Sequence, residues 1–297
     1  MSGSFRSLLL SLVSSVFLVL ASSAAQAQSQ AACTFKLFQV NPSNPNNPSF
    51  QANGVNDYGT VVGQAFFSPP KGFIRYSGGG VSYFAAPNSA TTSFLARNDG
   101  GINVGFYSTQ GANSNISKGF ILQGSTFTSF VHPKAVWGTQ LTGINTYNSA
   151  VGWYLDSGEF AHGFRRSSNG GLAALNFPGA QSTFAIGINA SGTVAGFYSN
   201  PNEHGFIYHN GQWATVDYPN TTGTEVYGIS NAGVVIGLDH SLEQGRAFLY
   251  ANGTFKVISV PNSFYTHALG IAPNGLITGM VLLNGSSAAS GFTATCK

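Results

Sequence analysis

One short pattern recurs six times along the chain, and it restricts the possible folds more than any other feature. Each copy is a turn followed by an apolar run that ends in glycine: "GVNDYGTVVG", "ARNDGGINVG", "GINTYNSAVG", "GINASGTVAG", "GISNAGVVIG" and "GIAPNGLITG". The final glycines are Gly63, Gly105, Gly152, Gly196, Gly237 and Gly279, at intervals of 42, 47, 44, 41 and 42 residues. Self-similarity at such a period indicates a repeat architecture, in which each unit buries its faces against its neighbours.

A single unit reads as four short β-strands. The runs "TFAIGI", "TVAGFY", "HGFIYH" and "WATVDYP" are rich in β-branched and aromatic residues. The connectors "NASG", "SNPNE" and "NGQ" contain Asn, Gly and Pro, which favour tight reversals of the chain. Proline cannot donate to a β-ladder, so it ends the fourth run as expected. The sequence therefore predicts a four-stranded antiparallel meander in each unit.

Four strands repeating every 40 to 45 residues is the spacing of a β-propeller blade. We therefore predict an all-β, six-bladed β-propeller, with repeats near 50–94, 95–141, 142–186, 187–227, 228–269 and 270–297. The last unit stops after its third strand, and residues 33–42 have the pattern of the missing outer strand, so the N-terminal strand is expected to close the ring. The recurring glycine should let neighbouring sheets approach. A recurring phenylalanine should fill the space between them, at Phe73, Phe120, Phe164, Phe206, Phe248 and Phe292.

The two cysteines stand near opposite ends of the chain. Cys33 begins the predicted closing strand and Cys296 ends the last one. An even pair in an exported protein predicts a disulfide, which here would replace the missing hairpin turn. The alternative is a lipid-modified Cys33, but Gln30 stands where such a site has an apolar residue, and the apolar run is too distant.

The first residues have the pattern of a secretory signal peptide. Arg6 precedes the apolar run 8–20, and Ala25-Gln26-Ala27 forms an A-x-A cleavage site, which predicts a signal peptide at 1–27 and one domain at 28–297. The alternative is a transmembrane anchor, but this run is shorter than the ~20 residues that a bilayer core requires. No later stretch could span, so we expect a secreted protein, extracellular or periplasmic.

Composition excludes some partners and favours β-structure. Charged residues make up only 7% of the chain, and the formal net charge is +3. Nucleic acid is therefore not expected as a partner. The many aromatic and β-branched residues supply enough apolar surface for a folded core.

The repeated turn followed by "HGF", "RAF" or "KGF" resembles the HAF repeats of bacterial extracellular proteins, named for a His-Ala-Phe motif. The resemblance covers nearly all of residues 28–297. Only His162 and His204 keep the histidine, and glycine usually replaces the alanine. The resemblance implies export and a propeller-like repeat, and it provides no catalytic residues.

Two sets of aligned positions are candidates for a site. Five units carry a threonine at Thr92, Thr139, Thr183, Thr224 or Thr266. Its hydroxyl could satisfy the backbone at the innermost strand's edge, or it could belong to a ring of ligand-binding groups. The residue that follows this threonine differs among the units, as a binding site on a symmetric scaffold would require. We hypothesise that Gln140, Glu225 and His267 cluster at the channel mouth, where Trp137, Tyr227 and Tyr265 offer aromatic faces to a sugar or another small organic ligand.

Cationic or imidazole side chains recur two residues before the phenylalanine, at Lys71, Lys118, His162, His204 and Arg246, with Ser290 in the last unit. They could form a basic ring for anionic ligands. The alternative, which we favour, is that each covers the neighbouring blade and donates to a carbonyl.

Catalytic motifs such as G-x-S-x-G and H-E-x-x-H are absent from the sequence, and the histidines lack ligand spacing. Asp156 with Glu159, and Asp239 with Glu243, could serve glycoside hydrolysis, but we interpret them as solvated loop charges. No cofactor is expected, although calcium at "DSGE" stays open. The sequence thus favours a binding module for carbohydrate or protein. An exported hydrolase or lyase and a purely structural exoprotein are the alternatives.

Overall fold

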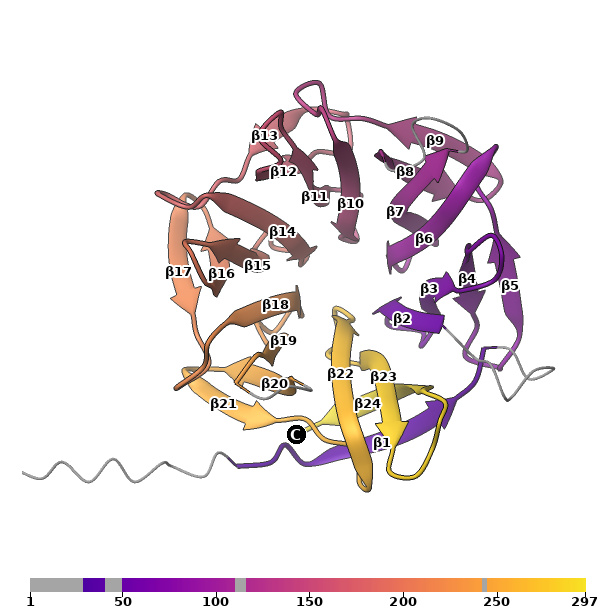
Figure 1. Ribbon diagram of the computed structural model, residues 1–297, viewed down its shortest axis with the longest axis vertical. Helices are drawn as coiled ribbons and strands as arrows, with labels where there is room; N and C mark the ends of the chain where they lie inside the picture. Colours follow the sequence, from indigo (N-terminus) through magenta and orange to yellow (C-terminus); the bar gives the residue numbers. More distant parts are fainter. Residues whose placement is uncertain (1–28, 41–49, 110–115, 242–244) are drawn as a thin grey trace, which may run out of the picture.

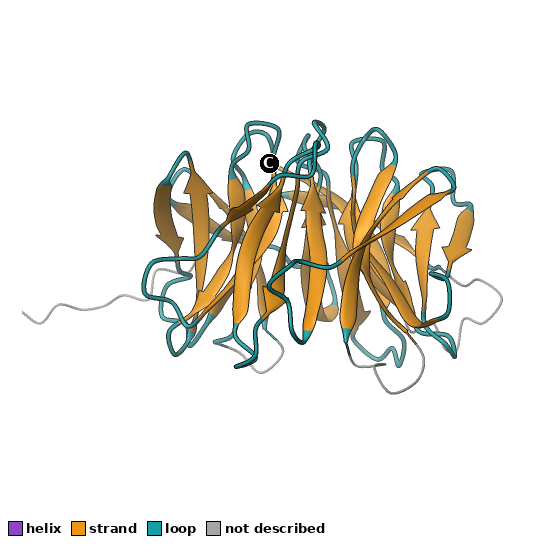
Figure 2. Cartoon of the chain, turned by 90° about the horizontal axis from the view of Figure 1, so that it is seen from above, coloured by secondary structure: helices purple, strands orange, loops and turns teal. Residues whose placement is uncertain are grey.

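The computed structural model describes residues 29–40, 50–109, 116–241 and 245–297. The predicted signal peptide lies outside these residues. Every regular element in the described part is a β-strand, and no helix there could cross a bilayer. The strands form twisted antiparallel sheets arranged around a central axis (Figure 1), and they run between two faces that carry the loops (Figure 2). The structure is therefore all-β and propeller-like.

Four of the sheets contain four strands each. In three of them the four strands follow one another along the chain. The first consists of β2 (Phe50–Val55), β3 (Val61–Ala65), β4 (Lys71–Arg75) and β5 (Val81–Phe84), and the second of β14 (Ser182–Ile188), β15 (Val194–Ser199), β16 (Glu203–His209) and β17 (Gln212–Val216). The third consists of β18 (Thr224–Ile229), β19 (Val235–Asp239), β20 (Arg246–Ala251) and β21 (Thr254–Val257). The fourth joins the two ends of the chain: β22 (Ser263–Ile271), β23 (Ile277–Leu283), β24 (Ser290–Cys296) and β1 (Cys33–Phe38).

The remaining sheet has eight strands and consists of two consecutive meanders. The first is β6 (Ser89–Arg97), β7 (Ile102–Thr109), β8 (Ser117–Gln123) and β9 (Thr126–Phe130). The second is β10 (Gly138–Ile144), β11 (Ala150–Leu155), β12 (Ala161–Arg166) and β13 (Leu172–Ala174). A single parallel pair, Gly138 with Ser117, joins the two.

The two ends of the chain meet in one hairpin-like ladder. β1 and β24 pair antiparallel from Cys33 opposite Cys296 to Phe38 opposite Gly291. The sulfurs of Cys33 and Cys296 form a disulfide, and the backbone N–H of Lys297 donates to the carbonyl of Ala32. The predicted disulfide is confirmed, and it lies where the other meanders have a turn.

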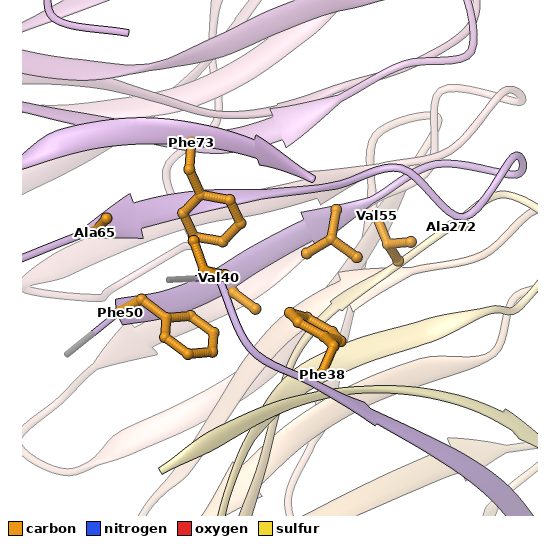
Figure 3. Close-up of a cluster of buried hydrophobic side chains, with 9 residues drawn as sticks. Phe38, Val40, Phe50, Val55, Ala65, Phe73 and Ala272 are labelled. Atoms are coloured by element: carbon orange, nitrogen blue, oxygen red, sulfur yellow. The ribbon is translucent and has the colours of Figure 1, made fainter. Parts of the chain in front are cut away.

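The recurring phenylalanines are buried as predicted. All six of these side chains have 0% exposed surface. One of the clusters brings the N-terminal segment into the first sheet: Phe38 and Val40 pack with Phe50 and Phe73 (Figure 3). Ala272 of the last sheet belongs to the same cluster. These contacts link the beginning of the chain to its end.

The recurring glycines have a different role from the predicted one. A Cβ at Gly152 would lie 2.0 Å from the carbonyl oxygen of Gln140, on the adjacent strand of the same sheet. The other five glycines of the set meet the equivalent carbonyl at 1.8 to 2.3 Å. A register shift in the innermost strand, between Leu141 and Gly143 in this case, accompanies the close approach. The prediction that these glycines admit a neighbouring sheet was therefore wrong.

A second set of glycines, on the innermost strands, provides that approach. A Cβ at Gly187 would lie 2.8 Å from the Cα of Gly228 in the next sheet. A Cβ at Gly270 would lie 2.4 Å from the Asn53 carbonyl, so the last sheet is as close to the first as the others are to each other. The innermost strands leave a central cavity of about 60 Å³ at this level.

Asparagines of the repeated turn connect neighbouring sheets by hydrogen bonds. The buried Nδ2 of Asn98 donates to the Asn145 carbonyl at 3.0 Å, and Asn145 donates in the same way to Asn189 at 3.0 Å. Each side chain also accepts a bond from its own turn, as Asn145 Oδ1 does from the Ser149 N–H. The asparagine of the "GIN" turn is thus a structural residue that satisfies buried backbone groups.

Candidate functional site

The predicted site lies on the face that carries the loops between consecutive meanders, which we call the loop face. The threonines of the first candidate set are buried there, with at most 5% exposed surface. Thr183 Oγ1 accepts a hydrogen bond from the Phe177 N–H at 2.9 Å. The other four accept from Ala86, His132, Tyr218 and Val260, each at 3.0 Å. The structural role is confirmed, but the partner is the residue before the loop proline and not the innermost strand's edge.

Two pairs of the predicted ligand-binding residues are in contact. Tyr227 donates its hydroxyl proton to Glu225 on β18. The rings of Tyr265 and His267 on β22 lie 4.7 Å apart. Burial raises the pKa of the Tyr227 hydroxyl, and the charge of Glu225 raises this pKa further, so the phenol keeps its proton and remains the donor.

Gln140 and Trp137 are placed differently from each other. Gln140 is half-buried on β10, where it pairs with Trp153 of β11. Trp137 is 46% exposed on the preceding loop, and its backbone N–H donates to Leu155. Its indole Nε1 reaches the Ser157 carbonyl at 3.5 Å. Trp137 is therefore held against the loop after β11.

An aromatic group that the sequence reasoning missed lies at the same level as Gln140. The rings of Phe184 and Phe197 stack at 4.7 Å, and Trp153 meets Phe184 edge-on at 5.4 Å. All three are half-buried. Phe184 occupies the aligned position of Gln140 and Glu225, so one unit places a phenyl ring where those two have a polar side chain. The ladder register could have revealed Trp153 and Phe197, because they pair directly with Gln140 and Phe184.

Two further polar residues lie near Glu225 or the adjacent Gly223, and the sequence did not identify them. His240 Nε2 lies 3.5 Å from Glu225 Oε2. A Cβ at Gly223 would lie 3.0 Å from Glu203 Oε2 and 3.6 Å from His240 Cδ2. Glu203 comes from the preceding sheet, so this group spans the boundary between two sheets. The loops that contain Glu203 and His240 were expected on this face, but nothing in their sequence shows which side chains turn toward Glu225.

The basic positions before the recurring phenylalanines bind carboxylates in three units. His162 Nε2 lies 2.9 Å from Asp156 Oδ2, and His204 Nδ1 lies 2.8 Å from Asp217 Oδ2. Arg246 Nε lies 3.6 Å from Asp239 Oδ2. The favoured prediction of a carbonyl acceptor was therefore wrong for these three side chains. Each of the three side chains already has a carboxylate partner, which argues against a basic ring for anions.

The two carboxylate pairs noted in the sequence have different environments. The Asp239 side chain is 0% exposed, so the prediction of a solvated loop charge was wrong for it; Arg246 offsets the cost of burial. Its sequence partner Glu243 lies outside the described residues. Asp156 is bound within its own loop: Oδ1 accepts from the N–H groups of Gly158 and Phe160. The hydrogen bond from His162 lowers the pKa of Asp156, and the backbone bonds act in the same direction.

Calcium at Asp156 has little support from this geometry. Both carboxylate oxygens of Asp156 already accept hydrogen bonds. Across residues 29–40, 50–109, 116–241 and 245–297, no three His, Cys, Asp or Glu side chains are grouped so that they could hold a metal ion.

Comparisons with known proteins support the architecture. No family model matches the chain. No curated protein matches it either. Solved structures do match. Virginiamycin B lyase from Staphylococcus aureus shares 11% identity at a TM-score of 0.53, over 87% of this chain and 85% of that one. A putative TolB from Agrobacterium tumefaciens shares 9% identity at 0.57, over 77% and 89%. The chain is a β-propeller.

The similarity extends to a binding protein as well as to an enzyme. Aleuria aurantia lectin, solved with Fucα1-6GlcNAc, shares 12% identity at a TM-score of 0.50, over 83% of this chain and 94% of that one. At these identities the likeness concerns the fold alone. A propeller scaffold is compatible with either function, so the function must be argued from the side chains.

Proposed function

We propose that this β-propeller has six blades, with boundaries near 50–94, 95–141, 142–186, 187–227, 228–269 and 270–297, and that residues 33–42 complete the last blade. The pairing of β1 with β24 and the approach of Gly270 to Asn53 support closure. The two meanders of the eight-stranded sheet, joined by one residue pair, count as two blades. The chain is in this view an exported protein of the HAF-repeat type, cleaved after Ala27. Sequencing the N-terminus of the exported product, with Gln28 expected first, tests this part.

The function that the geometry supports best is ligand binding at the loop face, with a carbohydrate as the ligand. The observation that carries this proposal is the neighbourhood of half-buried rings and unlike polar groups at one level of the inner strands. Phe184 and Trp153 offer aromatic faces, and Glu225 and Gln140 offer hydrogen-bonding groups. Sugars present apolar C–H faces and hydroxyl groups together, and sites for such ligands combine aromatic walls with a few fixed polar groups. A protein partner bound through the same face is the other form of this function.

A second candidate function is an exported hydrolase or lyase at the same place. Glu203 and His240 both approach Gly223, and His240 also approaches Glu225. The two carboxylates and the imidazole of this neighbourhood could supply the acid and the base for bond cleavage.

A glycan array with the purified protein tests the binding function, followed by calorimetric titration of the best glycan. Glu225→Gln keeps the shape of the side chain and removes its charge, and we expect it to weaken binding by about tenfold, the cost of one charge-assisted hydrogen bond. Glu159→Gln makes the same change on an exposed loop and should leave the affinity unchanged. An array without any bound glycan, or equal losses in both variants, would contradict the proposal. Release of reducing sugar from the bound glycan would favour the hydrolase.

A further inference from the structure

A larger hollow lies on the face opposite the loop face, between the sheet β18–β21 and the sheet that contains β24 and β1. Its volume is about 440 Å³. The turn that joins β18 to β19 and the turn that joins β20 to β21 form one wall, and residues 295–297 form part of the other. Small-molecule sites in proteins typically enclose about 300–1,000 Å³. The hollow is therefore large enough for a small organic ligand.

The break between β24 and β1 explains why the rim is open at this place. In the other sheets a turn joins the third and fourth strands, as Asn210 and Gly211 join β16 to β17. Here β24 ends at Cys296 and the disulfide to Cys33 replaces the turn. Thr295, Cys296 and Lys297 border the hollow instead.

The lining combines an apolar wall with amino groups. Val234 and Leu249 are half-buried there, and Ala251 extends the same wall. Lys256 and Lys297 supply two cationic side chains, and no described residue of the lining is acidic. The Lys256 Nζ lies 3.5 Å from the main-chain oxygen of Lys297, at the limit of hydrogen bonding.

We propose that this hollow binds a small anion with a compact apolar body, such as a medium-chain carboxylate. The apolar part would lie against Val234 and Leu249, and the carboxylate would accept hydrogen bonds from Lys256. Charge-assisted hydrogen bonds of this kind are about twice as strong as neutral ones, so the anionic group should dominate recognition. The site is separate from the one proposed for carbohydrate and does not depend on it.

Calorimetric titration with three eight-carbon probes tests the proposal: octanoate, octan-1-ol and octylammonium. We expect octanoate to bind most tightly, with an affinity that falls as sodium chloride is raised. Lys256→Met keeps most of the side-chain stem and removes the charge, and should weaken octanoate binding by about tenfold. Lys36→Met makes the same change on an exposed part of β1 and should have no effect.

Ala232→Trp locates the binding. Ala232 lies on an exposed turn at the hollow's rim, so an indole there should block the hollow without unfolding the protein. Loss of octanoate binding at an unchanged melting temperature is the expected result. The proposal is overturned if octanoate does not bind at millimolar concentration, if the three probes bind equally, or if Ala232→Trp and Lys256→Met bind octanoate like the unmodified protein. Glycan binding at the loop face should persist in both variants, so the two proposals can fail independently.

Discussion

Replacing Thr183 by valine tests the role assigned to the buried threonines. The two side chains have nearly the same shape, so the substitution leaves the packing and removes one oxygen. Thr183 Oγ1 is the acceptor for the Phe177 N–H at 2.9 Å, and the threonine is 2% exposed. Valine would leave this part-buried N–H without its partner.

The expected cost follows from that geometry. Leaving one buried donor unsatisfied costs about 1–3 kcal/mol of unfolding free energy. For a domain of about 250 residues, each kcal/mol lowers the melting temperature by roughly 2–4 °C. Thr183→Val should therefore melt about 2–12 °C below the unmodified protein. The equivalent changes at Thr139 and Thr224 should cost similar amounts, because their bonds have nearly the same length.

Thermal and urea unfolding followed by circular dichroism measure this effect. Thr126→Val is the matched control, because Thr126 is exposed on β9 and such surface changes usually stay within about 0.5 kcal/mol. If Thr183→Val is as stable as Thr126→Val, the hydrogen bond does not stabilise the loop and the structural assignment is wrong. If Thr183→Val instead binds glycan more weakly at unchanged stability, the result would support the alternative that the threonines form a ligand-binding ring.

Three further substitutions test other parts of the fold. Gly152→Ala should unfold the protein or lower its free energy of unfolding by more than about 4 kcal/mol, because the added Cβ would lie 2.0 Å from a backbone carbonyl oxygen that cannot move away. Gly78→Ala is the control: its Cβ would meet nothing within 4 Å, so expression and melting temperature should be unchanged. Cys296→Ser opens a crosslink across a sequence separation of 263 residues and should cost up to about 5 kcal/mol; an unchanged melting curve under non-reducing conditions would refute this. Asp156 has a pKa lowered from 3.8, so it stabilises the fold above pH 3.8 and this contribution is lost as the pH falls further. The difference in melting temperature between the unmodified protein and Asp156→Asn should accordingly shrink below pH 3.8, and a difference independent of pH would exclude the bond to His162 as its source.

The parts of the fold that the sequence predicts well are those that local chemistry determines. Strand runs, Asn-Gly turns and the buried phenylalanines depend on neighbours a few residues away. Each recurs in several units, so the prediction for one unit supports the prediction for the others. The glycines show the limit. A missing Cβ indicates that some atom comes close, but only the register of the bulged inner strand shows that the Gly152 contact is Gln140 in the same sheet.

The repeat pattern does not predict the positions of side chains that differ from one unit to the next. The candidate site consists of such side chains. Glu225, Asp239, His240 and Arg246 all belong to the sheet β18–β21 or its loops, in a chain of which only 7% is charged. Asp239 is fully buried beside the partly exposed Arg246, so the loss of either side chain should lower stability. Glu225 and His240 are partly exposed, and the 3.5 Å between them makes a weak pair. Glu225→Gln keeps an oxygen that can accept the Tyr227 hydroxyl, so this variant and His240→Ala should leave stability nearly unchanged. The same sheet thus contains a pair that stabilises the fold and, on other strands and loops, side chains available for a ligand. Binding that changes in Glu225→Gln and His240→Ala at constant melting temperature would assign this sheet as the one specialised for recognition.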